Sequence, residues 1–312
     1  MDFRGMAEIR LGAFPPLQGP APIPGTQAAF VGAAADAGLD HVCTGDHVSF
    51  FVGAGFDGLL NAASLSMVHS TMPVYVAVYL LPLRHPTLVA RQVADIELLA
   101  PGRLVLGVGI GGEDPHEYAV CDVDPRTRGR RMDESLTVLR SLLTGTSVTF
   151  HGEFFDLDDA VILPAPRTPV PLIIGGRSEA AVRRAALLGD GWIGVWNSAR
   201  RFAEVIASIE EQASAAGRRD HPSAHAMQVW CGIAEERTRA RKLLATAMEG
   251  FYQIPFDRFE RYSPYGTPTE VAEFLAPYVA AGCTTFNLIP QSPDIETAVE
   301  GTAEVRRLLA DA

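Results

Sequence analysis

Short apolar runs alternate with amphipathic segments along most of the chain. The clearest example spans residues 171–196, where an apolar run at 172–174 ends in two glycines, a helical segment of small residues follows, and a second apolar run occupies 192–195. An apolar run without polar alternation is typical of a strand buried on both faces. Two such strands joined by a helix predict a parallel βαβ unit, whose strand ends and helix start offer N–H groups to an anion.

The same alternation predicts eight strands in all. The other strands are expected at residues 7–14, 41–45, 73–81, 103–109, 224–233 and 284–289, and further helices at residues 25–37, 61–70, 86–100, 126–143, 202–216, 235–249, 269–281 and 295–310. Residues 110–124 are expected to be irregular. Eight strands alternating with helices predict an α/β fold, a (β/α)8 TIM barrel, with residues 1–312 as one domain.

Two insertions into this barrel are expected. Residues 147–163 alternate polar and apolar side chains, which predicts a β-hairpin after strand four. Residues 251–265 form the second, before strand eight, and we expect both segments to cap the substrate.

Composition excludes several classes of function. A net charge of -11 argues against a nucleic-acid surface. No run of about 18 apolar residues and no signal-peptide core is present, so we expect no membrane contact and a cytoplasmic location. The four cysteines are far apart, and neither a disulfide framework nor a metal site is predicted.

The glycines at residues 107–112 spell GxGxxG after a strand, the pattern of a dinucleotide-binding turn. That turn requires a helix starting on the third glycine, and here Glu113, Asp114 and Pro115 follow instead. The glycines are better explained by a strand end that passes close to a flat group or to a neighbouring helix.

Several side chains are expected at the carboxyl ends of the strands, where barrel enzymes place their chemistry. His47, after strand two, is a candidate acid or base, or a structural histidine; Asp46 beside it is suited to hold its tautomer or to bind a cofactor. Glu113, after strand four, is the candidate partner, or a solvated loop carboxylate. Arg177 and Arg200 lie at strand-to-helix junctions, where a phosphate would sit. The aromatic residues suited to line an apolar substrate pocket, or simply to pack the loops, are Phe50, Phe51, Phe56, Tyr79, Tyr118, Phe251, Tyr252 and Phe256.

Six motifs in order carry a resemblance to a known family. They are GDHV at 45–48, LPLRHP at 81–86, RLVLGVGIG at 103–111, RGRRMDESL at 128–136, VTFHGEFF at 148–155 and IIGGRSEAAVRRAALLGDGW at 173–192. Together they resemble the bacterial luciferase-like flavin and deazaflavin oxidoreductases over residues 9–196. The pair Asp46-His47 is similar to the deazaflavin branch of that family.

The resemblance implies a barrel that holds the deazaflavin coenzyme F420, or alternatively FMN, at its C-terminal mouth. It implies a non-proline cis peptide at Ala77-Val78 behind the ring, and His47 and Glu113 as catalytic residues, with Glu113 shifted by the extra Gly112. Relatives are often dimers, so a homodimer is expected. The residues implied or suggested for cofactor binding are Asp46, Ala77, Val78, Gly107, Gly109, Gly175, Gly176, Arg177, Asn197 and Arg200.

The function this implies is hydride transfer between F420 and a small carbonyl, alcohol or activated alkene. The first alternative is an FMN-dependent monooxygenase that uses O2 and reduced flavin from a separate reductase; the second is a barrel that binds flavin without catalysis. The sugar-phosphate dehydrogenases of the branch have a tryptophan where this chain has Phe51, and their phosphate-binding lysines have no clear match. The resemblance therefore does not carry over a glucose 6-phosphate substrate.

Overall fold

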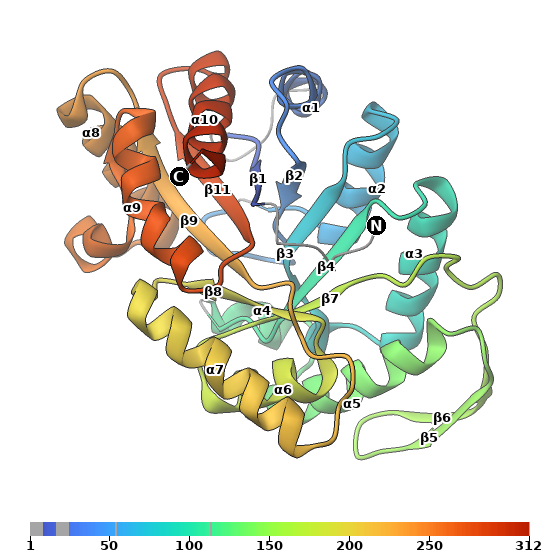
Figure 1. Ribbon diagram of the computed structural model, residues 1–312. Helices are drawn as coiled ribbons and strands as arrows, with labels where there is room; N and C mark the ends of the chain where they lie inside the picture. Colours follow the sequence, from blue (N-terminus) through green and yellow to red (C-terminus); the bar gives the residue numbers. More distant parts are fainter. Residues whose placement is uncertain (1–8, 17–24, 54, 113, 312) are drawn as a thin grey trace.

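The architecture is seen in a computed structural model, which describes residues 9–16, 25–53, 55–112 and 114–311. Eight parallel strands close into a barrel with helices between them (Figure 1). In barrel order the strands are β1 (Arg10–Ala13), β2 (His41–Thr44), β3 (Val74–Leu80), β4 (Leu104–Gly109), β7 (Leu172–Gly175), β8 (Gly191–Val195), β9 (Ala226–Ile233) and β11 (Thr285–Gln291). Pairing of β8 with β9 and of β11 with β1 closes the ring, which confirms the predicted (β/α)8 barrel.

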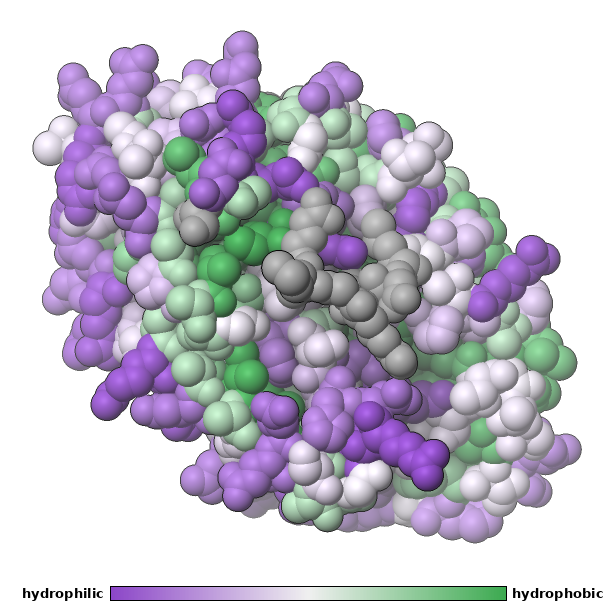
Figure 2. Space-filling model, viewed as in Figure 1, coloured by the Kyte–Doolittle hydropathy of each residue, from purple (hydrophilic) through white to green (hydrophobic). Residues whose placement is uncertain are grey.

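The outer layer consists of the helices that connect these strands. They are α1 (Thr26–Asp36), α2 (Gly58–Val68), α3 (Pro86–Leu99), α5 (Arg128–Leu142), α6 (Glu179–Leu188), α7 (Ala199–Ala215), α8 (Arg237–Tyr252), α9 (Pro268–Ala280) and α10 (Ile295–Ala310), with the short η1 (Leu81–Leu83) after β3. Apolar strand and helix residues form one large core between the two layers, and a smaller cluster fills the barrel interior. Figure 2 shows hydrophilic residues around much of the edge of one face, with apolar residues beside its centre.

The first insertion is the expected antiparallel hairpin, formed by β5 (Val148–His151) and β6 (Asp156–Ala160). It lies beside α5, outside the barrel wall (Figure 1). Glu134 on α5 holds it by accepting hydrogen bonds from the backbone N–H groups of residues 153, 154 and 155.

The second insertion is built from short elements that follow α8. They are η2 (Phe256–Arg258), η3 (Glu260–Tyr262) and β10 (Tyr265–Gly266), and β10 adds to the end of β9. This segment packs its aromatic side chains against α8 and the end of β9.

One prediction for the loops is wrong. Residues 110–124 were expected to be irregular, but Pro115–Val120 form a helix, α4. Asp114 caps it by accepting the His116 N–H, and Pro115 at the first position needs no hydrogen-bond acceptor. The short helix fixes the direction of the side chains that follow β4. No helix in the described part of the chain is long and apolar enough to cross a membrane.

Candidate functional site

A bulge in β3 shapes the mouth of the barrel. Relative to β4, one extra residue lies between Val76 and Tyr79. As a result Ala77 and Val78, although consecutive, both pack against the cluster that fills the barrel interior. The peptide bond between them is cis, as the resemblance implied. The contact of Ala77 and Val78 with a cofactor remains a prediction.

Three glycines on β4 and β7 make room for this bulge. A Cβ on Gly107 would lie 2.5 Å from the Val76 carbonyl oxygen, and one on Gly109 would lie 2.6 Å from Cγ2 of Val78. A Cβ on Gly175 would lie 3.1 Å from the other methyl of Val78. The close approach that these glycines allow is therefore to strand β3 and not to a helix. Their contact with a cofactor remains a prediction.

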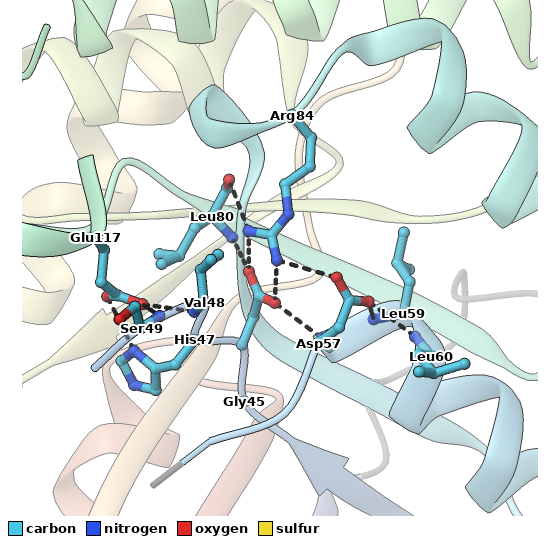
Figure 3. Close-up of polar contacts among 12 residues, drawn as sticks. Gly45, His47, Val48, Ser49, Asp57, Leu59, Leu60, Leu80, Arg84 and Glu117 are labelled. Carbon is cyan, nitrogen blue, oxygen red and sulfur yellow. Dashed lines mark hydrogen bonds and ion pairs between the residues drawn. The ribbon is translucent and has the colours of Figure 1, made fainter. Parts of the chain in front are cut away.

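His47 lies just beyond β2 and is paired with a buried carboxylate. Its Nδ1 is 3.1 Å from Oε2 of Glu117, and its ring stacks on Phe50 with centroids 4.0 Å apart. The other Glu117 oxygen accepts the backbone N–H groups of Val48, at 2.6 Å, and Ser49, at 3.3 Å. Figure 3 shows these contacts converging on the one carboxylate. The loop after β2 is thus fastened to α4.

The protonation of this pair follows from its contacts. Burial alone would raise the pKa of Glu117, but the hydrogen bonds from His47, Val48 and Ser49 outweigh it and lower the pKa. An ionised carboxylate only accepts, so in the neutral imidazole Nδ1 of His47 carries the proton and Nε2 keeps a lone pair. No partner for Nε2 occurs among the described residues. The arrangement can accept a proton at Nε2 and hold the resulting charge beside Glu117.

Glu117 is the residue that the sequence analysis missed. Glu113, the predicted partner of His47, lies outside the described residues. Asp114-Pro115 is a helix-start signal, and Glu117 falls in the first turn of the helix that it begins. That signal was available in the sequence, but the pairing with His47, 70 residues away, was not.

Asp46, predicted to bind the cofactor, is occupied by protein donors. It is 3% exposed, and its carboxylate accepts the N–H groups of Gly58 and Leu80, each at 2.8 Å. Arg84 adds two charged hydrogen bonds, at 2.6 and 2.8 Å, and also contacts Asp57, the cap of α2 (Figure 3). Burial raises the pKa of Asp46, and Arg84 opposes that rise. With its four acceptor positions filled, the carboxylate joins β2 to the end of the β3 bulge instead of facing a ligand.

Aromatic rings form a continuous set from His47 to the end of β8. Phe251 lies 5.0 Å from Phe50 and 5.6 Å from Trp230, measured between centroids. Tyr252 continues the set, 4.9 Å from Phe251 and 5.1 Å from Trp196. We call Phe50, Phe251, Tyr252, Trp230 and Trp196 the aromatic wall.

The other aromatic residues predicted for the pocket lie differently. Phe51 contacts Phe50 in a tilted arrangement, with ring centroids 4.3 Å apart, and is 47% exposed, and Phe56 is 39% exposed. Tyr79 belongs to the core between barrel and helices and lies under Arg84, because the bulge turns it outward. Tyr118 donates its hydroxyl to the Ile110 carbonyl and packs in a separate cluster. The structure therefore gives Tyr79 and Tyr118 packing roles in place of the pocket-lining role expected of them.

The end of β7 has the features of an anion site. Gly175 and Gly176 precede α6, Gly176 has φ of 124°, and Ser178 caps the helix by accepting the Ala181 N–H. Arg177 is exposed, lies 5.5 Å over the Trp196 ring and has no carboxylate partner among the described residues. These residues can present N–H groups and a cation to a phosphate.

Two weaker candidates at the end of β8 have other contacts. Asn197 is buried and donates its amide to the Val195 carbonyl. The Arg200 side chain is 89% exposed and pairs with Glu204 along α7. Cofactor binding by these two residues remains a prediction. Within the described segments, no group of acidic, cysteine and histidine side chains is arranged to hold a metal ion.

Comparisons with known proteins agree with this fold. The chain is 27% identical to an F420-dependent glucose-6-phosphate dehydrogenase of Kineococcus radiotolerans over 289 residues, 84% of this chain and 86% of that protein. An F420-dependent secondary alcohol dehydrogenase in complex with an F420-acetone adduct has a TM-score of 0.85 at 22% identity, over 97% of this chain and 99% of the other. EDTA monooxygenase from Chelativorans sp. has a TM-score of 0.77 at 16% identity, over 97% and 94%.

Higher identity is confined to part of the chain. A protein of Mycobacterium tuberculosis is 36% identical over 156 residues, 50% of this chain, so the match spans about half the length of that relative, 54%. The family described as luciferase-like monooxygenase matches residues 1–264. Because that match covers most of the sequence, this chain belongs to the luciferase-like monooxygenase family.

Proposed function

We propose that this protein is an oxidoreductase that transfers hydride between the deazaflavin F420 and a small organic alcohol or carbonyl compound. The observation that carries the proposal is the His47–Glu117 pair, placed beyond β2 beside the aromatic wall. Hydride removal from an alcohol must be matched by removal of a proton, and His47 is suited to accept it at Nε2.

The residues around the mouth fit a flat, phosphorylated cofactor. Gly107, Gly109 and Gly175 let the Val78 bulge approach β4 and β7 closely, and this bulge would lie behind a planar ring at the mouth of the barrel. Gly176 and Arg177 would hold its phosphate. When bound, the deazaflavin supplies a carbon that accepts or donates hydride.

His47 and Glu117 would manage the proton. Glu117 fixes Nδ1 of His47 as the donor, so Nε2 is directed toward the substrate as the acceptor. The charge formed on His47 is stabilised by the carboxylate, which lies in a largely buried place where electrostatic interactions are strengthened. In the reverse direction the same Nε2 returns the proton to a carbonyl oxygen.

The similar proteins support the same reading without deciding the cofactor. F420-dependent dehydrogenases occur among the relatives, and a monooxygenase shares the fold. The second candidate function is therefore an FMN-dependent monooxygenase supplied with reduced flavin by another protein.

The experiment is a parallel titration with F420 and FMN, in which affinity and oxygen uptake are measured. We expect F420 to bind with the higher affinity, and its reduction to proceed without oxygen. Tighter binding of FMN, together with oxygen uptake that depends on substrate, would refute the proposal. A 5-deaza carbon does not form the flavin's peroxide adduct, so the two results exclude each other.

A further inference from the structure

We propose that the substrate is an uncharged alcohol or ketone with an aryl or comparably bulky apolar body, and not a phosphorylated sugar. This inference rests on the proposed function and names the substrate class of the same site. It is carried by the shape and charge of the surface beside His47.

The aromatic wall begins at the proposed base. Phe50 stacks on the His47 ring, and Phe251 lies 5.9 Å from that ring and 5.0 Å from Phe50. Both phenylalanines come from covering segments, the loop after β2 and the end of α8. Phe50 is buried, so the half-buried Phe251 is the ring that the rest of the molecule would contact when a carbinol carbon is placed at His47.

Two of the three polar tips of the wall contact each other, because the Trp230 indole N–H donates to the Tyr252 hydroxyl at 3.0 Å. The third, the buried Trp196 indole N–H, has no hydrogen-bond partner among the described residues and can serve a single hydroxyl or carbonyl oxygen. A sugar has a hydroxyl on almost every carbon, and each would need a partner when it is desolvated. Aryl and alkyl groups have no such need and gain from ring contact.

The charges near His47 disfavour an anion. Glu117, which contacts His47, is 3% exposed and has a lowered pKa, so a buried negative charge already lies at the site. Arg177 lies at the opposite end of the wall, beside Trp196, where the cofactor phosphate is proposed. A phosphorylated substrate would thus meet a carboxylate at one end and compete for the cation at the other.

Several cations on α8 and in residues 251–265 have partners of their own, whereas Arg258, in η2, is exposed and makes no ion pair among the described residues. Arg241 makes two hydrogen bonds with Glu260, and Arg237 pairs with Glu270. Arg261 lies over the ring of Tyr262. The one lysine of the sequence, Lys242, is exposed on α8. None of the latter four is set against the aromatic wall.

The reaction for such a substrate balances with the cofactor alone. With a deazaflavin bound, the hydride of the carbinol C–H bond would be taken up by the cofactor, and Nε2 of His47 would accept the proton of the O–H bond. The alcohol would lose two electrons as its C=O double bond forms. His47 would then release its proton to water, and the reduced cofactor would take up one proton from water.

The test compares four compounds by calorimetric titration and by turnover with F420: 1-phenylethanol, acetophenone, glucose and glucose 6-phosphate. We expect the two aryl compounds to bind and to be interconverted, and glucose 6-phosphate to show no binding. Phe251→Leu should weaken acetophenone binding about tenfold, the order of one lost aromatic contact, and leave F420 affinity unchanged. Phe274→Leu on α9, the same change away from the mouth, is the matched control.

Two results would overturn the inference. One is tighter binding or faster oxidation of glucose 6-phosphate than of 1-phenylethanol; the other is equal acetophenone affinity in the Phe251 and Phe274 variants. The F420 titration is read separately. If F420 fails to bind, the proposed function is wrong, whereas F420 binding without an aryl preference contradicts only the substrate class.

Discussion

Replacing Glu117 with Gln should invert the hydrogen bond that fixes His47. In the native protein one carboxylate oxygen accepts the N–H groups of Val48 and Ser49, and the other accepts from Nδ1 of His47. The Gln carbonyl can keep the two backbone contacts, because both go to the same oxygen. Its NH2 group then faces Nδ1, which must become an acceptor, and the proton moves to Nε2. The base at the substrate is lost while the side chain keeps its shape.

The size of each effect follows from these contacts. A carboxylate that holds a histidine tautomer contributes about 10⁴-fold to turnover when its amide analogue is the comparison, a magnitude taken from serine protease triads. We expect kcat to fall by that order. Stability should fall only by about 1–2 kcal/mol, since charged hydrogen bonds become neutral ones but no buried donor is left unpaired.

The assay measures F420 reduction with 1-phenylethanol, F420 affinity and the ¹⁵N shifts of the histidine rings, which report the tautomer. Glu97→Gln is the control, because Glu97 is also a buried carboxylate, and each of its two oxygens accepts one backbone N–H, from Gly102 and Leu104. Its Gln amide must face one of those donors, so this variant should cost at least as much stability, and it should leave kcat unchanged. If Glu117→Gln keeps kcat within about threefold of the native value, or leaves the proton on Nδ1, the proposed role of the pair is refuted.

Three further predictions concern residues that stabilise the barrel. Arg84→Met leaves Asp46 buried without its charge partner, with only the N–H groups of Gly58 and Leu80, so denaturant melts should show a loss of about 3–5 kcal/mol in the free energy of unfolding; a loss under about 1 kcal/mol would contradict the stabilising role of the Arg84–Asp46 pair. Gly107→Ala places a methyl 2.5 Å from the Val76 carbonyl oxygen and should lower stability by about 1–3 kcal/mol and weaken cofactor binding, whereas Gly32→Ala, with open space around it, should do neither. Burial lowers the pKa of His225 from 6.5 to about 4, so the folded state resists its protonation and stability should fall by about 2 kcal/mol between pH 7 and pH 5. If the His225→Asn variant loses as much stability between pH 7 and pH 5 as the native protein does, protonation of His225 is not the cause of the loss.

The barrel itself could be predicted because its strands are buried on both faces. A parallel strand covered by helices is apolar along its whole length, and this uninterrupted run can be recognised in the sequence without knowing which strands lie beside it. Helix ends were less accurate. The helix predicted at 61–70 is α2, which starts at Gly58 because Asp57 accepts the N–H groups of Leu59 and Leu60. Asp before an apolar run was the signal for that start.

Single residues of the site could be predicted from the sequence, but their contacts could not. His47 could be placed at a strand end, whereas its partner Glu117 depends on where α4 packs, and no local sequence pattern encodes that packing. Asp46 was predicted to contact a ligand and instead contacts the protein. Its position at the strand end suggested a cofactor contact, yet Arg84 and two backbone N–H groups use the whole carboxylate. Pairings between residues far apart in the chain are set by packing, so they appear only once the fold is known.

The central claim is direct hydride transfer between the substrate carbon and the deazaflavin, and a deuterium label tests it most directly. The alcohol turned over fastest, deuterated at the carbinol carbon, is incubated with the protein and F420 in normal water, and the reduced cofactor is examined by NMR and mass spectrometry. Our account predicts one deuterium on the reactive ring carbon and none in the solvent. Label found in water, or turnover that requires oxygen and leaves the ring unlabelled, would contradict it.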